Sequence, residues 1–367
     1  MRLRHVRATQ PATSARRHAP QPMPRTSTWR RWPRFGVAAG AGTGVAAGTA
    51  VAWALQHRVV ARSTAEAART AKGAFVVPGD LLHHFVDLDD GGVAHVVERG
   101  SGPPIVLVHG ATLSSDLWCQ QLTELGARHR MIAVDVRGHG RSTPGSDGFR
   151  GGMGRLAADL RQVFDALDVE GAVLAGHSLG GMISLQLAAE APSGWRARHL
   201  HALALLDTSA GPLASWRGAS RMRRPISGAL ARAMVVADRI GVGPARSADV
   251  RWWSARFAFG PDPDPAQVAF TESMGAPTPV ATLAGVLGTL ASFDITARLP
   301  DVDLLALVVV GSHDRLTPPS HARRLADGLP RAELVELPRA GHMPMLERPH
   351  ELARLLDELA GKVAAGS

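Results

Sequence analysis

The stretch Ala172-Val-Leu-Ala-Gly-His-Ser-Leu-Gly-Gly-Met182 decides the fold, because it combines a buried strand, a serine between glycines and the start of a helix. A G-x-S-x-G nucleophile elbow requires this order of strand, sharp turn and helix. Gly176 and Gly180 permit the turn, since a Cβ atom at either position would collide with the neighbouring strand or helix. Ser178 is the candidate nucleophile. The alternative is a serine that only caps the helix beginning at Leu179.

Short apolar runs alternate with amphipathic stretches along most of the chain. The runs are at residues 105–108, 131–134, 172–174, 202–206, 304–310 and 334–337. This alternation predicts a mostly parallel sheet with crossover helices on both sides.

Two other segments have different patterns. A turn sequence, Asp-Asp-Gly-Gly at 89–92, separates two alternating segments and predicts an antiparallel N-terminal hairpin. The interval between Leu206 and Leu304 lacks a strand pattern, so we expect an inserted helical cap over about 211–295.

Five sequence blocks occur in an order typical of one superfamily. They are Val108-His109-Gly110, Asp-Val-Arg-Gly-His-Gly-Arg-Ser at 135–142, the elbow, Gly-Ser-His-Asp-Arg-Leu-Thr-Pro at 311–318 and Gly-His-Met-Pro at 341–344. On these blocks, residues 81–361 resemble the α/β-hydrolase superfamily of the capped type. The resemblance implies an α/β fold and a serine hydrolase of the esterase or lipase kind, although this fold hosts many reactions.

Two further residues are expected to assist Ser178. His342 follows a predicted strand in a Gly-His turn, from which its imidazole can reach the serine as general base. Asp314 follows another predicted strand and would orient His342, and Asp207, which ends the strand before the cap, is the alternative acid. A carboxylate that only makes an Asx turn is the structural alternative for either aspartate.

The resemblance also implies an oxyanion hole made of two backbone N–H groups. These belong to Leu179, which follows the nucleophile, and to Ala111, which follows the His109 block. We expect structural roles for His109, His139 and His177, which lie inside the family blocks or beside the nucleophile.

A serine at 178 separates this chain from the epoxide hydrolases and haloalkane dehalogenases that it otherwise resembles, because those enzymes attack with a carboxylate. We therefore expect cleavage of carboxylic esters of apolar or lipid-like substrates through an acyl-serine intermediate. The alternatives are a carbon-carbon bond or lactone hydrolase with the same triad, and a non-catalytic membrane-anchored binding protein on the same fold.

The cap region is rich in aromatic and basic residues, which either line a pocket for an apolar group or form the cap's own core. They are Arg221, Arg223, Arg224, Trp252, Trp253, Phe257 and Phe259.

Composition bears on cofactors and partners. The formal net charge of +9 equals the nine arginines of residues 1–34, a segment without an acidic residue, so the rest of the chain is neutral and we expect no nucleic-acid partner. Cys119 is the single cysteine, which excludes an intramolecular disulfide or a cysteine-based zinc site. No metal-ligand or phosphate-binding pattern is visible, so we expect no cofactor.

The N-terminal region has the pattern of a membrane anchor. A basic tail at 1–34 precedes an uncharged segment at 35–56, which is long enough to cross a bilayer, and a stalk at 57–80 follows. The basic flank would stay in the cytoplasm, which predicts a single-pass protein of the cell membrane with the catalytic domain outside. The alternative is secretion after signal cleavage near Ala52-Trp53-Ala54.

The same segment carries glycines at four-residue spacing. They are Gly36, Gly40, Gly44 and Gly48, and this small-residue face predicts a possible homodimer between two membrane helices.

Overall fold

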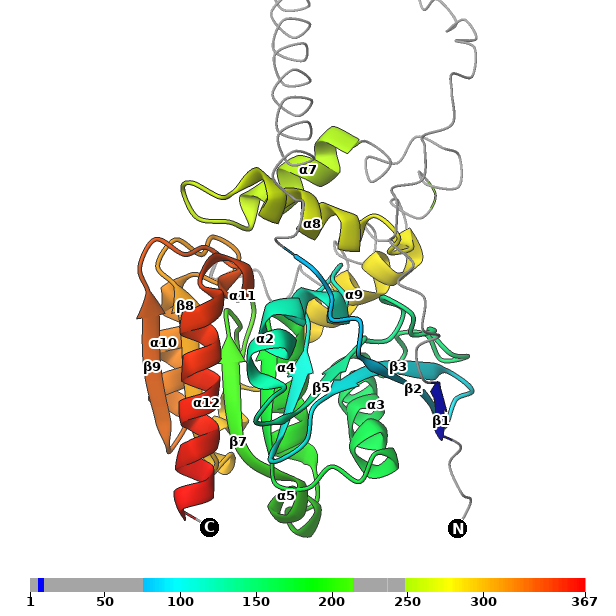
Figure 1. The fold of residues 1–367 in the computed structure, drawn as a ribbon, viewed down its shortest axis with the longest axis vertical. Helices are drawn as coiled ribbons and strands as arrows, with labels where there is room; N and C mark the ends of the chain where they lie inside the picture. Colours follow the sequence, from blue (N-terminus) through cyan, green and yellow to red (C-terminus); the bar gives the residue numbers. More distant parts are fainter. Residues whose placement is uncertain (1–5, 10–74, 214–235, 237–247, 367) are drawn as a thin grey trace, which may run out of the picture.

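The computed structural model describes residues 6–9, 75–213, 236 and 248–366. Nine strands of these residues form one sheet in the order β1-β2-β3-β5-β4-β6-β7-β8-β9 (Figure 1). The strands are β1 (Val6–Thr9), β2 (Leu82–Asp87), β3 (Val93–Arg99), β4 (Pro104–Val108), β5 (Arg130–Val134), β6 (Ala172–His177), β7 (Leu200–Leu206), β8 (Leu305–Gly311) and β9 (Ala332–Leu337).

The sheet begins antiparallel and continues parallel. Strand β2 pairs antiparallel with β3, with Phe85 opposite His95, and β3 pairs antiparallel with β5. From β5 through β4 to β9 every pairing is parallel. This confirms the predicted fold class, an α/β-hydrolase sheet with an antiparallel N-terminal hairpin.

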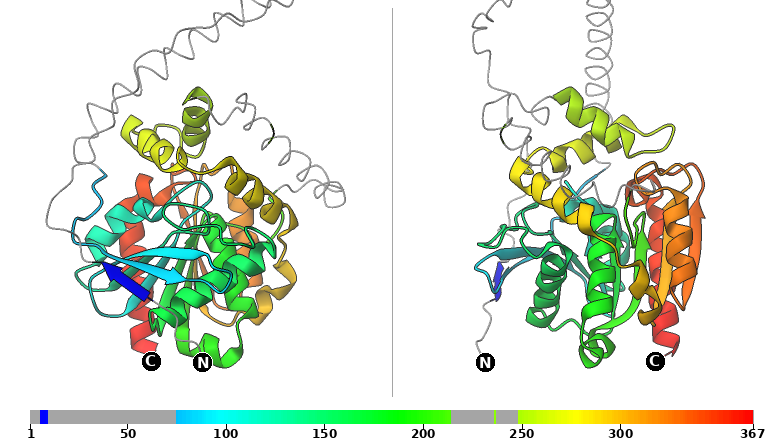
Figure 2. Two further views of the ribbon diagram at one scale, coloured as in Figure 1. Left: turned by 90° about the vertical axis from the view of Figure 1, so that its right-hand side faces the viewer. Right: turned by 180° about the vertical axis from the view of Figure 1, so that it is seen from behind.

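Helices cover both faces of the sheet (Figure 2). They are η1 (Ser115–Trp118), α2 (Cys119–Leu125), α3 (Gly152–Ala166), α4 (Leu179–Glu190), α5 (Ser193–His199), η3 (Thr296–Asp301), α10 (Pro319–Gly328), α11 (Pro344–Glu347) and α12 (Pro349–Gly366). One apolar core lies against α3, α4 and α10, and a second lies against α2 and α12.

Strand β4 shows how the sequence builds these two cores. Val106 and Val108 belong to the first core, whereas Ile105 and Leu107 belong to the second. Successive side chains of a strand point to opposite faces, so a strand that is covered on both faces needs a continuous apolar run rather than an alternating one.

Three helices lie beyond the carboxyl ends of the parallel strands (Figures 1 and 2). They are α7 (Ala248–Phe257), α8 (Pro265–Gly275) and α9 (Val280–Ser292). Helix α8 begins with a capping box, in which the Asp264 side chain accepts from Gln267 N–H and the Gln267 side chain accepts from Asp264 N–H. Its first residue is Pro265, whose missing N–H would have no partner within the helix. The predicted cap over 211–295 is thus described only in part, and Arg221, Arg223 and Arg224 lie outside the described residues.

The predicted anchor at 35–56, with Gly36, Gly40, Gly44 and Gly48, also lies outside the described residues. Within the described part, no single helix is long and apolar enough to cross a bilayer. Helices α8 and α9 pass that test only as a pair, by length and composition, with a bend of 98° between them.

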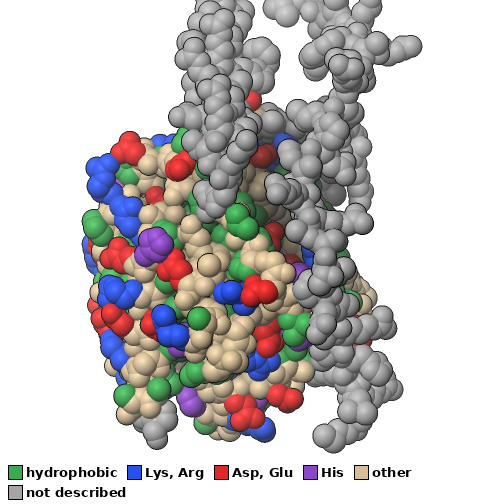
Figure 3. Space-filling model, viewed as in Figure 1, with side chains coloured by type: hydrophobic (Ala, Val, Ile, Leu, Met, Phe, Trp, Pro, Cys, Tyr) green, Lys and Arg blue, Asp and Glu red, His purple; other side chains and the backbone are tan. Residues whose placement is uncertain are grey.

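Strand β1 was not predicted from the sequence. Residues 6–9 of the basic tail pair antiparallel with β2, with Val6 opposite Val86. Among the described residues visible in Figure 3, Lys and Arg side chains are interspersed with Asp and Glu side chains, without a stripe of one sign.

Candidate active site

Ser178 occupies a strained turn between β6 and α4. Its backbone dihedrals are φ 52° and ψ −114°, a region that residues other than glycine rarely adopt. It stands at the N-cap position of α4, yet its side chain makes no capping hydrogen bond. The strain and the free hydroxyl are what a nucleophile elbow requires, and they disfavour the capping alternative.

Close backbone contacts explain the glycines of the turn. A Cβ atom on Gly176 would lie 2.4 Å from the Gly180 carbonyl oxygen, and one on Gly180 would lie 2.2 Å from the Val108 carbonyl oxygen. The turn is held further by the neighbouring strand, since Ser178 N–H donates to Leu206 O at 3.0 Å and Thr208 Oγ1 donates to Ser178 O at 2.6 Å.

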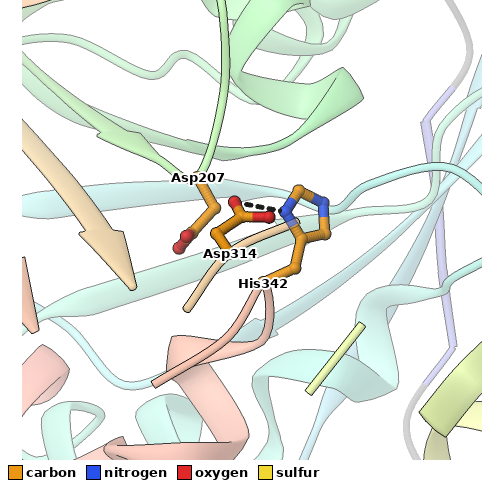
Figure 4. A group of neighbouring side chains, drawn as sticks. All are labelled: Asp207, Asp314 and His342. Atoms are coloured by element: carbon orange, nitrogen blue, oxygen red, sulfur yellow. Dashed lines mark hydrogen bonds and ion pairs between the residues drawn. The ribbon is translucent and has the colours of Figure 1, made fainter. Parts of the chain in front are cut away.

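His342 and Asp314 form a buried pair. His342 Nδ1 lies 2.8 Å from Asp314 Oδ2, and the two residues are each 4% exposed (Figure 4). Because a carboxylate only accepts, Nδ1 carries the proton of this bond, which leaves Nε2 as the acceptor of a neutral imidazole. This is the tautomer that a general base in a triad needs.

The loop after β8 fixes the orientation of Asp314. Its Oδ1 accepts from the N–H groups of Leu316 at 2.7 Å and Thr317 at 3.0 Å, and its Oδ2 accepts from Thr317 Oγ1 at 2.6 Å. Asp314 therefore makes the Asx turn and bonds His342 at the same time. Burial by itself would raise the pKa of Asp314, but the charge of His342 and these hydrogen bonds outweigh burial and hold the pKa below its usual range.

Asp207, the alternative acid, lies behind Asp314. It is fully buried at the end of β7, and its Oδ1 accepts from Gly311 N–H at 2.9 Å. Asp314, rather than Asp207, bonds the ring of His342 (Figure 4).

Two contacts hold the backbone of His342. The ring of His177 donates from Nε2 to the His342 carbonyl at 2.8 Å, and the His342 N–H donates to Ala258 O at 2.6 Å. Burial, followed by the nearby charge of His342, lowers the pKa of His177 well below its usual value, so His177 is a neutral structural donor. Ala258 directly follows α7, so the cap segment contacts the loop that carries the candidate base.

A cavity of about 840 Å³ lies between the carboxyl edge of the sheet and helices α7, α8 and α9. Ser178, His342 and Ala111 all line it, whereas Asp314 and Asp207 lie behind its wall. Most of the remaining lining is apolar, with Leu113, Val250, Val280, Leu283, Leu316 and Met343. Its size falls within the range of about 300–1,000 Å³ that is typical of small-molecule sites.

Ser178 and His342 share this cavity without a direct bond. Among the described residues, neither Ser178 Oγ nor His342 Nε2 makes a hydrogen bond. In structures without substrate, catalytic hydrogen bonds are often long and tighten only when the substrate binds.

The expected oxyanion donors belong to two different segments of the chain. Leu179 is the first residue of α4 and is buried, and Ala111 lines the cavity from the loop after β4. The neighbouring Gly110 comes so close to the nucleophile that a Cβ atom on it would lie 3.1 Å from Ser178 Cβ.

The aromatic residues of the cap do not line the cavity formed by the described residues. Trp252 and Phe259 are buried in the core beneath α7, whereas Trp253 and Phe257 are 40% and 48% exposed. Trp252 and Phe259 belong to the second apolar core, which includes sheet residues, rather than to a separate core of the cap. The pocket-lining interpretation does not hold for the cavity that the described residues form.

Charged groups in the cavity wall were not predicted from the sequence. Arg251 on α7 and Glu272 on α8 form an ion pair of 2.7 Å, and both residues line the cavity. No motif marks such a pair, because it depends on how two cap helices pack together.

His109 and His139 make backbone contacts. His109 Nδ1 donates to Gly110 O at 2.7 Å while its Nε2 accepts from Val136 N–H at 2.9 Å, and His139 Nδ1 donates to Arg137 O at 2.9 Å. Burial lowers the pKa of His109 and lowers that of His139 to about 4, so both rings are neutral and hold loops at neutral pH.

Several known proteins are similar to this chain in sequence. The family model described as the alpha/beta hydrolase fold matches residues 103–349. RutD of Variovorax paradoxus, a protein named for carbamate hydrolysis, is 32% identical over 267 residues, which are 72% of this chain and 94% of RutD. Polyketide synthase ThaQ of Burkholderia thailandensis is 29% identical over an alignment of 306 residues that covers 79% of this chain but 13% of ThaQ.

A solved structure agrees with these matches. A thermophilic esterase from Thermogutta terrifontis superposes with a TM-score of 0.60 at 27% identity, over 79% of this chain and 97% of that one. Since the family model covers well over half of the sequence and the sheet has the family's topology, this chain belongs to the alpha/beta hydrolase family.

Proposed function

We propose that this protein is a serine hydrolase that cleaves carboxylic esters of apolar substrates through an acyl-Ser178 intermediate. One observation carries the proposal: an imidazole bonded to a buried carboxylate lines the same cavity as a serine in a strained elbow. The predominantly apolar lining of that cavity supports an apolar acyl or alcohol group in the substrate.

The proposed reaction has two halves. Ser178 Oγ attacks the ester carbonyl while His342 Nε2 takes the hydroxyl proton, and Asp314 stabilises the resulting imidazolium. His342 then donates that proton to the leaving alcohol as the carbon-oxygen bond breaks. In the second half, water attacks the acyl-serine while His342 takes the water's proton. His342 then returns that proton to Ser178 Oγ as the acyl carbon-oxygen bond breaks and the acid is released.

Backbone N–H groups are proposed to stabilise the oxyanion of both tetrahedral intermediates. Leu179 supplies one at the start of α4, and Ala111 supplies the other. Each such donor is worth about 2.7–4 kcal/mol of transition-state stabilisation in comparable enzymes.

The test uses the full-length protein and a fluorophosphonate probe, which reacts with activated serines. We expect labelling of the wild type and of Ser184→Ala, a matched change of a buried serine on the same helix, and no labelling of Ser178→Ala. A folded wild type that is not labelled would instead favour the binding-protein alternative.

A substrate panel identifies the bond that is cleaved. We expect p-nitrophenyl esters of graded acyl length to be hydrolysed faster than lactones, diketones or carbamates, and Ser178→Ala to lose about 10⁴-fold or more in kcat. Preference for lactones or diketones would support the lactone or carbon-carbon hydrolase alternative, and preference for carbamates would match the name of RutD.

Location at the cell membrane stays a prediction from residues 1–56. The pairing of β1 with β2 bears on it, because a single crossing at 35–56 would place residues 6–9 and the domain on opposite sides of the bilayer. Protease treatment of intact cells tests whether the C-terminal domain lies outside the cell. Digestion of this domain would indicate an outward orientation, and full protection would contradict it.

A further inference from the structure

A second carboxyl group, that of Asp207, lies directly behind the proposed triad. One side-chain atom each of Asp207, Asp314 and His342 lie within 4.8 Å of one another, and all three residues are buried. In Figure 4 Asp314 stands between the other two, so that Asp207 is on the side away from the imidazole. The mechanism proposed above makes no use of Asp207.

The hydrogen bonds of Asp207 do not satisfy an ionised carboxylate. Its Oδ1 accepts from Gly311 N–H at 2.9 Å. Its Oδ2 is buried and has no donor among the described residues. The neighbouring polar group is the Asp314 carboxyl, which is itself an acceptor, and two acceptors attract each other only when a proton lies between them.

The donors around each carboxyl decide which one holds this proton. Asp314 accepts from Leu316 N–H, Thr317 N–H, Thr317 Oγ1 and His342 Nδ1, whereas Asp207 accepts only from Gly311 N–H. The carboxyl with four donors is the better stabilised anion. We infer that Asp207 keeps the proton and donates it from Oδ2 to Asp314, and so acts as a positioning residue that orients the acid of the triad.

The electrostatic environment agrees with this geometry. Burial and then the charge of Asp314 raise the pKa of Asp207 well above its usual range, and the charge of Glu347 adds to this effect. The titratable groups that face Asp207 are Asp314, in the loop after β8, and His342 and Glu347, in the segment after β9. Burial raises the pKa of Glu347 as well, against the hydrogen bonds that it accepts from Gly260, Gly341 and Met343.

The inference rests on the proposed function for its catalytic consequence, and its test compares two replacements of Asp207 in the full-length protein. Asp207→Asn keeps a donor toward Asp314 without a titrating proton, whereas Asp207→Leu has a similar volume and no donor. Ser209→Ala is the matched control, because Ser209 lies on the same loop but bonds His321 and Gly211.

We expect Asp207→Asn and Ser209→Ala to retain kcat within about threefold, with an unchanged acid limb in the pH profile of kcat/KM. Asp207→Leu should lose at least about tenfold in kcat, because it removes a hydrogen bond to the charged Asp314 carboxylate. If Asp207 were ionised, Asp207→Asn would remove an anion near the base and move the acid limb to lower pH. That shift would overturn the inference, as would equal activity of Asp207→Leu and the wild type.

A readout without catalysis separates this inference from the proposed function. If Asp207 is protonated when folded, the thermal stability of Asp207→Asn relative to the wild type rises as the pH increases from about 4 toward the folded pKa of Asp207. A constant difference over this range would overturn the inference even if Ser178 is the nucleophile. A rising difference in a protein without hydrolase activity would refute the proposed function alone.

Discussion

Two buried histidine-aspartate pairs in this molecule have nearly the same local geometry. His342 Nδ1 lies 2.8 Å from Asp314 Oδ2 at the carboxyl edge of the sheet, and His95 Nδ1 lies 2.7 Å from Asp135 Oδ2 beside the N-terminal hairpin. Each of the four residues is no more than 4% exposed. By distance and burial alone, either pair would qualify as part of a catalytic group.

The pairs differ in what surrounds them. His342 lines a cavity together with Ser178. His95 Nε2 instead lies 2.9 Å from His83 Nδ1, and Asp135 also accepts from Ser115 N–H and Arg141 N–H, which ties the N-terminal hairpin to the segments after β4 and β5. The first ring keeps a nitrogen available for substrate chemistry, and the second uses both nitrogens to hold the fold. A histidine-aspartate bond therefore indicates catalysis only when the far nitrogen faces a nucleophile in a cavity.

The largest expected effect is loss of activity at the first pair. Asp314→Asn removes the acceptor for the charged imidazole, so we expect kcat for the preferred ester to fall about 10⁴-fold while the protein stays folded. Steady-state kinetics and circular dichroism check this. A fall of less than about tenfold would mean that another group, with Asp207 the nearest, serves as the acid.

The second pair should respond in stability instead. Asp135→Asn leaves two backbone donors and His95 without their anion, so we expect the free energy of unfolding at pH 7 to drop by about 3–5 kcal/mol. Chemical denaturation measures this change. The activity of the remaining folded protein should stay within about tenfold, and a selective 10⁴-fold loss of kcat would erase the contrast between the two pairs.

The pH dependence of that loss has a definite sign. Burial opposes ionisation of Asp135, but the hydrogen bond from His95 and the charges of His109 and His95 lower its pKa to about 2. A lowered pKa contributes stability above the unfolded value of about 3.9, and this contribution is lost as the pH falls toward 2. The difference between wild type and Asp135→Asn should therefore shrink between pH 5 and pH 2.5.

Asp207 behaves in the opposite sense. Its pKa is raised in the folded protein, so its stability contribution is complete below the unfolded value and declines as the pH rises toward the folded value. We expect Asp207→Asn to gain stability over the wild type as the pH rises above the unfolded value, by at most about 1.4 kcal/mol for each pH unit. Urea denaturation at three pH values measures the slope, and Ser209→Ala should show none.

The smallest expected effect concerns His83, which contacts the histidine of the second pair. His83 is half-buried, burial lowers its pKa, and its Nδ1 shares a hydrogen bond of 2.9 Å with His95 Nε2. His83→Ala should lower the free energy of unfolding by about 1 kcal/mol without changing kcat. A marked change in kcat would mean that the hairpin and the active site are coupled.

The sequence predicted the features that depend on local pattern. Strand-helix alternation located β4 to β9, and the glycines around Ser178 predicted a turn that the dihedral angle of 52° bears out. The Gly-His turn at 342 and the loop at 314 were recognisable because each follows a buried strand.

Features that depend on contact between distant segments could not be predicted. The pairing of β1 with β2 joins residues more than seventy positions apart, and the proximity of Asp207 to Asp314 follows from two strands being neighbours in the sheet. The sequence offered these two aspartates as alternatives for one role, because a linear pattern cannot show that they lie together.

The contact between the cap and the base loop has a consequence for chimeric enzymes. His342 N–H bonds Ala258 O, and Gly260 N–H bonds Glu347, so residues 258–260 belong structurally to the C-terminal loop although they are part of the insertion. Grafting a relative's insertion to transfer its selectivity should therefore keep residues 258–260 of this chain between the grafted helices. A graft that replaces this tripeptide would change the setting of the imidazole along with the specificity.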